Sequence, residues 1–283
     1  MKDFTGKVVV ITGAGSGIGR ALAQNLAARG AVLAVSDVDD AGLAETVRLL
    51  GSATVRSDRL DVRDRVAMAG YASAVAEQFG VVNVLINNAG VALTGSVADM
   101  SYADLEWVMD IDFWGVVNGS KEFLPHLIAS GDGHLVNLSS LFGLLAVPGQ
   151  SAYNAAKFAV RGFTEALRQE MLVARAPVAV SCVHPGGIRT AIARNARVAE
   201  GEDQAALADY FDRKLAKTSP AKAAEIIVAG MQAGKPKIVV GADAKFLDLL
   251  VKLLGARYQG LLAGQARKRV PQRRQPVTDR VGP

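Results

Sequence analysis

Along most of the chain, short continuous runs of hydrophobic residues alternate with segments in which hydrophobic residues recur at helical spacing. Short apolar runs rich in β-branched residues predict buried parallel strands, at 7–12, 32–36, 54–57, 83–86, 134–139, 178–183 and 237–241. Between them, apolar residues recur at helical spacing, at 18–29, 41–50, 64–79, 102–129, 151–174 and 220–233. This alternation predicts an α/β fold: a single Rossmann-type, doubly wound parallel sheet of about seven strands with helices on both faces. Pro125 is expected to kink or end the fourth helix.

A glycine-rich segment joins the first predicted strand to the first predicted helix; it reads Gly13-Ala14-Gly15-Ser16-Gly17-Ile18-Gly19. Strand, glycine-rich turn and helix together make a phosphate-binding unit. Gly13 permits the tight turn, Gly17 lets the backbone approach a pyrophosphate, and Gly19 lets the helix lie close to the strand. The spacing G-x-x-x-G-x-G differs from the commoner G-x-G-x-x-G. An ordinary strand-to-helix turn would not need three spaced glycines, so the segment predicts a dinucleotide site.

Asp37 ends the second predicted strand, eighteen residues after Gly19. This is close to the roughly 20 residues expected before a carboxylate that binds the adenosine ribose hydroxyls. Its charge would repel the 2′-phosphate of NADP, and Val38 offers no basic replacement, so the sequence favours NAD over NADP. The alternative role is an N-cap for the next helix, which Asp39 or Asp40 could provide equally well.

The candidate for chemistry is Tyr153-x-x-x-Lys157, with Ser140 thirteen residues before the tyrosine. Because a helix turns once per about 3.6 residues, Tyr153 and Lys157 share one helix face. The ammonium favours phenolate and lowers the tyrosine pKa from its ordinary value of about 10, as a base near neutral pH requires. Ser140 supplies a hydroxyl that could hold a substrate oxygen against the tyrosine. Taken alone, such a pair is more often a surface lysine beside a half-buried tyrosine.

In this order and spacing, the motifs resemble the short-chain dehydrogenase/reductase family from about Lys7 to Gly241. The matching pieces are TGAGSGIG at 12–19, Asp37, Asp61-Val62, Asn87-Asn88-Ala89-Gly90, Ser140, Tyr153-x-x-x-Lys157 and Pro185-Gly186-Gly187-Ile188-Arg189-Thr190. The resemblance implies an NAD(P)-dependent oxidoreductase. The cofactor site that it implies consists of Gly13, Ser16, Gly17, Ile18, Gly19, Asp37, Asp61, Val62, Asn88, Ala89, Gly90, Tyr153, Lys157, Ile188 and Thr190.

The resemblance also implies which part of the cofactor each motif contacts. Asp61 and Val62 would contact the adenine, and the segment 88–90 would lie under the cofactor at the switch point of the sheet. Ile188 and Thr190 would hold the nicotinamide amide, and Lys157 would bind the nicotinamide ribose.

Asp112 departs from the family pattern, which often has a catalytic asparagine in the helix before the serine strand. Asparagine donates and accepts hydrogen bonds, whereas ionised aspartate only accepts. Asp112 could still anchor a water on the way to Lys157 and act as a fourth catalytic residue, although its charge would partly cancel the effect of Lys157 on Tyr153. The alternative is a structural helix residue with a different water route. The sequence leaves both hypotheses open.

Composition agrees with one globular enzyme domain: 50% of the 283 residues are hydrophobic and 21% are charged. The single cysteine, Cys182, cannot form an internal disulfide and is expected to fill the core, which favours a reducing cytoplasmic location. The three histidines lack metal-ligand spacing, so no metal site is predicted. The N-terminus lacks the pattern of a signal peptide, and no apolar segment reaches the ~20 residues that span a bilayer.

We expect residues 1–243 to form the cofactor-binding catalytic domain. Within it, the charged stretch 190–217 breaks the alternation and is interpreted as a substrate lid, or alternatively as an ordinary surface helix pair. Residues 244–263 are expected to form an amphipathic helix, because apolar side chains recur at helical spacing over 246–262. Residues 264–283 are expected to be a basic, flexible tail.

Positive charge gathers at the C-terminus. From residue 256 onward, seven Lys and Arg face one Asp, a net charge of +6, while the whole chain is +5, so the remainder is about −1. We favour a helix packed on the domain or on a neighbouring subunit, followed by a solvated tail. The alternatives are an anchor on anionic membranes and nonspecific contact with nucleic acid; the lack of interleaved aromatic residues disfavours the latter.

The sequence thus predicts an oxidoreductase that transfers a hydride between NAD(H) and a secondary alcohol or ketone. Tyr153 would exchange a proton with the substrate oxygen, which Ser140 would orient. An apolar substrate is expected because the site is flanked by Leu93, Leu141, Phe142, Leu144, Leu145, Val147 and Trp114. The family resemblance implies a homodimer or homotetramer. The alternatives are a non-catalytic NAD-binding sensor or scaffold on the same fold, and a peripheral membrane lipid-alcohol dehydrogenase.

Overall fold

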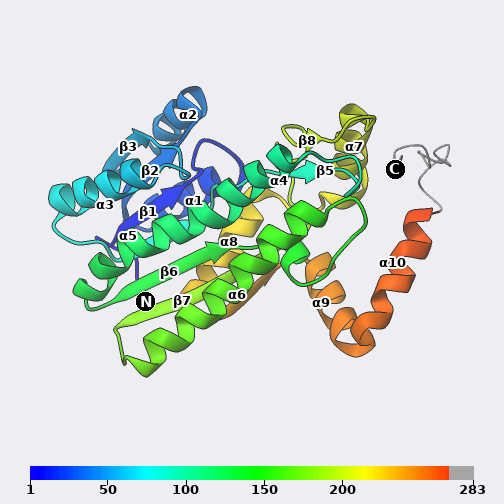
Figure 1. Ribbon diagram of the computed structural model, residues 1–283. Coiled ribbons are helices and arrows are strands. Elements are labelled where there is room, and N and C mark those ends of the chain that lie inside the picture. Colours follow the sequence, from blue (N-terminus) through cyan, green and yellow to red (C-terminus); the bar gives the residue numbers. More distant parts are fainter. Residues whose placement is uncertain (268–283) are drawn as a thin grey trace, which may run out of the picture.

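The computed structural model describes residues 1–267, and one sheet of seven parallel strands forms its centre (Figure 1). The strands are β1 (Val8–Thr12), β2 (Val32–Asp37), β3 (Val55–Arg59), β4 (Val84–Asn87), β6 (Gly133–Leu138), β7 (Val178–Pro185) and β9 (Lys237–Val240). Their spatial order is β3-β2-β1-β4-β6-β7-β9, so the winding reverses between β1 and β4. The predicted doubly wound sheet is confirmed, and ligands of such sheets bind at this reversal.

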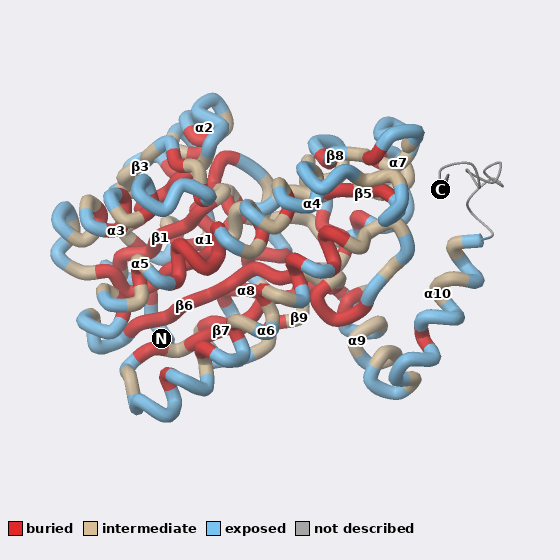
Figure 2. Tube along the Cα trace, in the orientation of Figure 1, coloured by how far each residue is buried: buried red, intermediate tan, exposed pale blue. Residues whose placement is uncertain are grey.

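Helices cover both faces of the sheet. One face carries α1 (Gly17–Ala27), α2 (Asp40–Leu50) and α8 (Pro220–Gln232), and the other carries α3 (Arg65–Phe79), α5 (Gly115–Ala129) and α6 (Ser151–Val173). Strand β1 serves both faces: Val9 and Ile11 pack in the first layer, and Val8 and Val10 in the second. Successive strand side chains point to opposite faces, so strands covered on both sides are apolar throughout. Figure 2 shows the buried strand traces between the helices.

The helix predicted at 102–129 has three parts: α4 (Tyr102–Met109), a π-helical turn η1 (Asp110–Trp114), and α5. A π turn accommodates an extra residue and often occurs at functional sites. Of the two predicted effects of Pro125, a kink or an end of the helix, the end is wrong, because α5 continues to Ala129. The carbonyl that Pro125 leaves without a partner belongs to Lys121, which is exposed, so water can satisfy it.

The segment 190–217 is fastened to the domain at two places. Its strand β8 (Arg197–Val198) pairs with β5 (Leu93–Thr94), a small parallel pair that was not predicted. The residues that flank its two ends, Ile188 and Thr218, form an isolated β-bridge. Between these points lie helix α7 (Gln204–Tyr210) and the π turn η3 (Phe211–Leu215).

The C-terminal segment forms two helices instead of the predicted single helix over 246–262. Helix α9 (Ala242–Leu254) ends at Gly255, whose φ of +53° is left-handed, and a 3₁₀ turn η4 (Gly255–Arg257) leads into α10 (Tyr258–Arg267). Glycine tolerates this conformation, which stops a helix. Residues 264–267 are the last turn of α10, and the rest of the expected tail lies outside the described residues. Within residues 1–267, no helix is long and apolar enough to cross a bilayer.

Candidate active site

Tyr153 and Lys157 lie one turn apart on α6 with both side chains in the interior. Their exposed fractions are 9% and 4%. The Nζ atom of Lys157 lies 5.6 Å from the centre of the Tyr153 ring. The two side chains therefore share one helix face, as their spacing predicts.

Ser140 lies two residues after β6 and opens a 3₁₀ turn, η2 (Leu141–Gly143). Its Oγ accepts the N–H of Phe142 at 3.1 Å. The Ser140 side chain also hydrogen-bonds to Tyr153, an interaction that favours phenolate. The ring of Phe142 meets the ring of Tyr153 edge to face at 6.0 Å. Ser140, Tyr153 and Lys157 are therefore brought together.

Two buried residues that sequence reasoning missed hold the Ser140 loop in place. Nδ2 of Asn154 donates to the carbonyls of Phe142 at 2.7 Å and Leu145 at 2.8 Å. Nδ1 of His184 lies 3.0 Å from the carbonyl oxygen of Ser140. Burial lowers the pKa of His184 to about 4, so the imidazole is neutral and its Nδ1–H can donate to this carbonyl. The only sequence signal for either residue was a polar side chain among apolar neighbours.

Asp112, on the π turn η1, is fully buried and is a direct partner of Lys157. Its Oδ2 lies 3.1 Å from Nζ of Lys157, and its Oδ1 accepts the N–H of Val91 at 2.7 Å. A Cβ on Gly90 would lie 3.2 Å from Oδ1 of Asp112 and 3.3 Å from Nζ of Lys157. Glycine at position 90 thus leaves room for this ion pair.

Burial dominates the protonation of this cluster. Burial raises the pKa of Tyr153, the charge of Lys157 opposes this shift, and the charge of Asp112 adds to it. Lys157 thus lowers the pKa of Tyr153 as predicted, but in the protein alone burial outweighs the lysine and the net shift is upward. Burial lowers the pKa of Lys157, but Asp112 reverses the shift, so the net change is upward and the lysine is charged. Burial also raises the pKa of Asp112 against the opposing effect of Lys157.

The glycine-rich turn after β1 has the shape that a dinucleotide needs. Gly13 (φ +65°) and Gly17 (φ +53°) are left-handed. A Cβ on Gly17 would lie 3.0 Å from Cγ2 of Thr190, and a Cβ on Gly19 would collide with the carbonyl of Gly13. Ser16 stands at the N-cap of α1 without a capping bond from its side chain. Its hydroxyl and the first N–H groups of the helix can therefore face an anion.

Asn88 ties this turn to the end of β4. Its Nδ2 donates to the carbonyls of Thr12 and Gly13, both at 2.9 Å. The backbone N–H groups of Asn88 and Ala89 donate to Oγ1 of Thr12 at 3.1 Å and 3.2 Å. These bonds hold the segment 88–90 beside the turn at the reversal of the sheet, where the family resemblance implies it.

Asp37 lies beside the same turn, at the end of β2. Its Oδ2 accepts the N–H of Gly15 at 2.7 Å, and its Oδ1 accepts the N–H of Asp39 at 3.0 Å. The N-cap of α2 is Asp39, which accepts the N–H of Gly42 at 3.1 Å. The alternative role of Asp37 as this helix cap is therefore wrong.

The Asp61-Val62 turn packs against α5. Nδ2 of Asn118, a third residue that was missed, donates to the carbonyl of Val62 at 2.9 Å. The Asp61 carboxylate pairs with Arg63 at 2.6 Å, and this hydrogen-bonded pairing lowers the pKa of Asp61. Asn118 gave no signal beyond being an amide inside an apolar helix.

Apolar side chains pack around Tyr153; they include Leu93, Met100, Trp107, Val108 and Phe142. The prediction that Trp114 joins them is wrong. The guanidinium of Arg65 lies 5.2 Å from the Trp114 ring, which also contacts Phe113. Trp114 is 41% exposed and follows Asp112 by two residues, so the two side chains leave the helix on different sides.

Comparisons with known proteins agree with this geometry. The family model described as short chain dehydrogenase matches residues 7–201. The chain belongs to the short-chain dehydrogenase/reductase family. It is 62% identical over 273 residues to a Mycobacterium tuberculosis protein named "Putative oxidoreductase SadH", covering 96% of this chain and 99% of the relative. It is 34% identical over 271 residues to dehydrogenase/reductase SDR family member 7B of Bos taurus, covering 92% and 82%.

Among solved structures, a short-chain dehydrogenase/reductase from Burkholderia phymatum in complex with NAD superposes with a TM-score of 0.83. It is 31% identical, and the match covers 98% of this chain and all of that chain. As a member of this family, the protein is an NAD(P)-dependent oxidoreductase.

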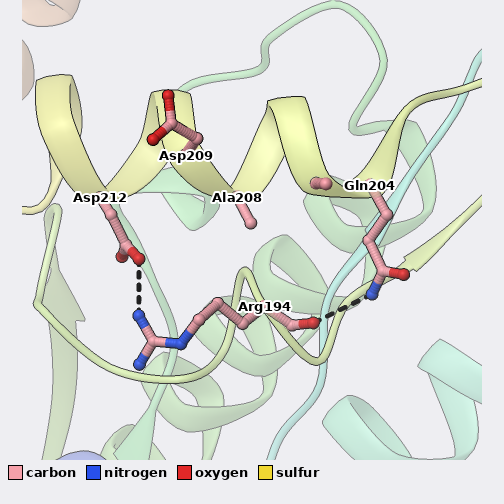
Figure 3. A pocket seen from close by; sticks show the side chains of 6 residues that line it. Arg194, Gln204, Ala208, Asp209 and Asp212 are labelled. Carbon is pink, nitrogen blue, oxygen red and sulfur yellow. Dashed lines mark hydrogen bonds and ion pairs between the residues drawn. The ribbon is translucent and has the colours of Figure 1, made fainter.

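In this short-chain dehydrogenase/reductase, the segment 190–217 borders an open cavity of about 430 Å³, lined by both charged and apolar side chains (Figure 3). Arg194 pairs with Asp212 at 2.6 Å, and the side chain of Gln204 donates to the carbonyl of Arg194 at 2.9 Å. None of the predicted catalytic residues lines this cavity. It is a feature of the segment itself, separate from the Ser140–Tyr153–Lys157 cluster.

Proposed function

We propose that this protein transfers a hydride between NAD(H) and an apolar secondary alcohol or ketone. The observation that carries the proposal is the buried cluster of Ser140, Tyr153 and Lys157. A phenol and an ammonium are costly to bury, and such clusters with shifted pKa values gather at functional sites.

Each residue of the cluster has one task. Tyr153 exchanges a proton with the substrate oxygen, and Ser140 hydrogen-bonds to that oxygen and orients it. Lys157 favours the phenolate form of Tyr153, and Asp112 keeps Lys157 charged. NAD, when bound, supplies or accepts the hydride. We propose Asp112 as a fourth member of the set through its ion pair with Lys157.

We propose NAD as the preferred cofactor, held by the glycine-rich turn, Asp37, the Asp61-Val62 turn, the segment 88–90, Ile188 and Thr190. The N–H of Gly15 fixes the carboxylate of Asp37 beside the glycine-rich turn, and a negative charge at this position would repel a 2′-phosphate. Lys157 would bind the nicotinamide ribose. NAD in the Burkholderia relative supports this preference.

The apolar side chains around Tyr153 support a substrate with few polar groups. We also propose a cytoplasmic homodimer or homotetramer, as is typical of the family.

A screen of alcohols and ketones, with NADH absorbance as the readout, tests the function. We expect turnover of apolar secondary alcohols by the native protein and none by Tyr153→Phe. Binding of NAD without turnover on any member of a broad panel would instead support a non-catalytic sensor or scaffold.

A further inference from the structure

Helix α9 has two apolar faces on opposite sides. Its inner face, formed by Ala244, Leu247, Val251 and Leu254, packs with Leu141, Leu145 and Tyr258 in one cluster. Its outer face carries Phe246, Leu249 and Leu253, at positions i, i+3 and i+7, and Leu261 of α10 is exposed as well. The four residues are 64%, 56%, 75% and 55% exposed. The fold therefore accounts for the inner face and leaves the outer face uncovered within residues 1–267 (Figure 2).

A groove of about 560 Å³ lies between α9 and α10, and its lining is mostly apolar. The groove reaches from the exposed side chains of Phe246 and Leu261 to Leu247, Val251 and Leu145 of the inner cluster. Leu145 belongs to the loop that follows Ser140, and Oη of Tyr258 accepts the N–H of Ala146 in that loop at 2.9 Å. The inner cluster and Tyr258 thus join this helix pair to the loop of the catalytic serine.

The acidic residues of α9 are directed into the fold. Oδ2 of Asp243 accepts the N–H of Gly187 at 2.8 Å, and Asp248 pairs with Lys237 at 2.7 Å and with Lys252 at 2.9 Å. Among residues 1–267, three cations of α9 and its continuation have no ion-pair partner: Lys245, Arg257 and Arg267. The sequence that follows adds Lys268, Arg269, Arg273 and Arg274 before the single Asp279.

We propose that the outer face of α9 and α10 docks on the surface of an anionic lipid bilayer. A bilayer buries the four apolar side chains and neutralises the unpaired cations of the same C-terminal segment. A second copy of the chain would cover the leucines but would bring the same positive charges together across a two-fold axis, which is unfavourable. A nucleic acid would neutralise the charge but leave the leucines in water. This proposal does not depend on the proposed reaction.

Cosedimentation of the full chain with vesicles tests the proposal. We expect binding to vesicles of equal parts phosphatidylglycerol and phosphatidylcholine, and little binding to pure phosphatidylcholine. Binding should weaken at least tenfold between about 0.05 M and about 0.5 M NaCl, because salt screens the cations. The double variant Leu249→Gln, Leu253→Gln should lose about tenfold or more in binding, because it removes apolar side chains that enter the interface.

The matched control is Leu172→Gln, Val173→Gln on α6, whose native side chains are 61% and 86% exposed. This variant should bind vesicles as the native chain does. Undiminished vesicle binding by the α9 double variant would show that the basic tail alone attracts lipid, and it would overturn the proposal. A failure of the native chain to bind anionic vesicles at low salt would also overturn it. So would a smaller assembly of the α9 double variant in analytical ultracentrifugation, which would identify the face as a contact between copies.

Discussion

Apolar side chains are usually buried and charged side chains usually exposed. The catalytic interior and the C-terminal helix pair each break one half of this rule. Around Lys157, charged and polar groups are buried, whereas on α9 and α10 large apolar groups are exposed. The two buried ionisable groups of the candidate active site have partners from the same chain: Asp112 for Lys157, and Ser140 for Tyr153. Within residues 1–267, the outer face of α9 has no such partner. Buried charged groups that are paired within the chain indicate a site of chemistry. An exposed apolar face without cover indicates contact with something outside the chain.

The largest effect should come from the interior. Tyr153→Phe removes the proton-transfer group and leaves the ring, so turnover should fall by about 10³-fold or more while NAD binding stays nearly unchanged. Lys157→Ala should damage both, because it removes the charge beside Tyr153 and a proposed ribose contact. Steady-state rates and NAD titrations separate the two variants. Substantial turnover by the phenylalanine variant on any accepted substrate would exclude Tyr153 as the base.

A direct test of the comparison is to delete one buried charge and one exposed apolar side chain. Asp112→Ala leaves Lys157 buried without its partner and should lower the free energy of unfolding by about 3–5 kcal/mol. Leu253→Ala should change it by less than about 0.5 kcal/mol, because the side chain is already in water. Urea unfolding of both variants gives the two values. An equal loss of unfolding free energy in the two variants would contradict the claim that the Asp112 charge is paired inside the fold and the Leu253 side chain is not.

The cofactor end of the interior should show a smaller effect. We expect NAD to bind at least about tenfold more tightly than NADP, a margin of about 1.4 kcal/mol. Asp37→Ala should narrow this margin, because the carboxylate no longer repels a 2′-phosphate. Fluorescence titrations of both proteins with NAD and with NADP measure this difference in affinity. NADP binding as tight as NAD in the unmutated protein would show that Asp37 does not select the cofactor.

The two regions meet at Tyr258, and cutting their link should have a modest effect. Tyr258→Phe removes the acceptor for the N–H of Ala146, and should cost about 1 kcal/mol of stability. If this bond positions the loop after Ser140, the rate should fall as well, with unchanged NAD affinity. Thermal melts and rates together check this prediction. A variant indistinguishable from native in both would mean that α10 only rests on the domain.

The smallest change should be a shift of pH dependence. The charge of Asp112 raises the pKa of Tyr153, so Asp112→Asn should lower the pKa of Tyr153 as long as Lys157 keeps its proton. Oxidation needs the phenolate, and its alkaline rise should therefore move to lower pH with little loss of maximal rate. The amide oxygen can still accept the N–H of Val91, which preserves the turn. A pH–rate profile unchanged by the substitution would favour a purely structural Asp112.

Local sequence determined the elements and the motifs that they carry. Apolar runs predicted the seven strands, because a strand buried on both faces is apolar throughout. Helical periodicity predicted most helices, because a helix buried on one face repeats its apolar residues at helical spacing. The spacing of Tyr153 and Lys157 fixed their common face for the same reason. The glycine-rich turn was predictable because left-handed backbone at Gly13 and Gly17 restricts the residue type.

Tertiary structure alone decided which polar groups meet. Asp112 reaches Lys157 through a π turn, Asn154 and His184 hold the Ser140 loop, and Tyr258 bonds to Ala146 from 112 residues away. No periodicity encodes such pairs, because a buried polar group needs only some partner, and the topology of the chain supplies it. The net pKa of Tyr153 was likewise undecidable from sequence, since it depends on the balance between burial and two charges whose distances the fold sets.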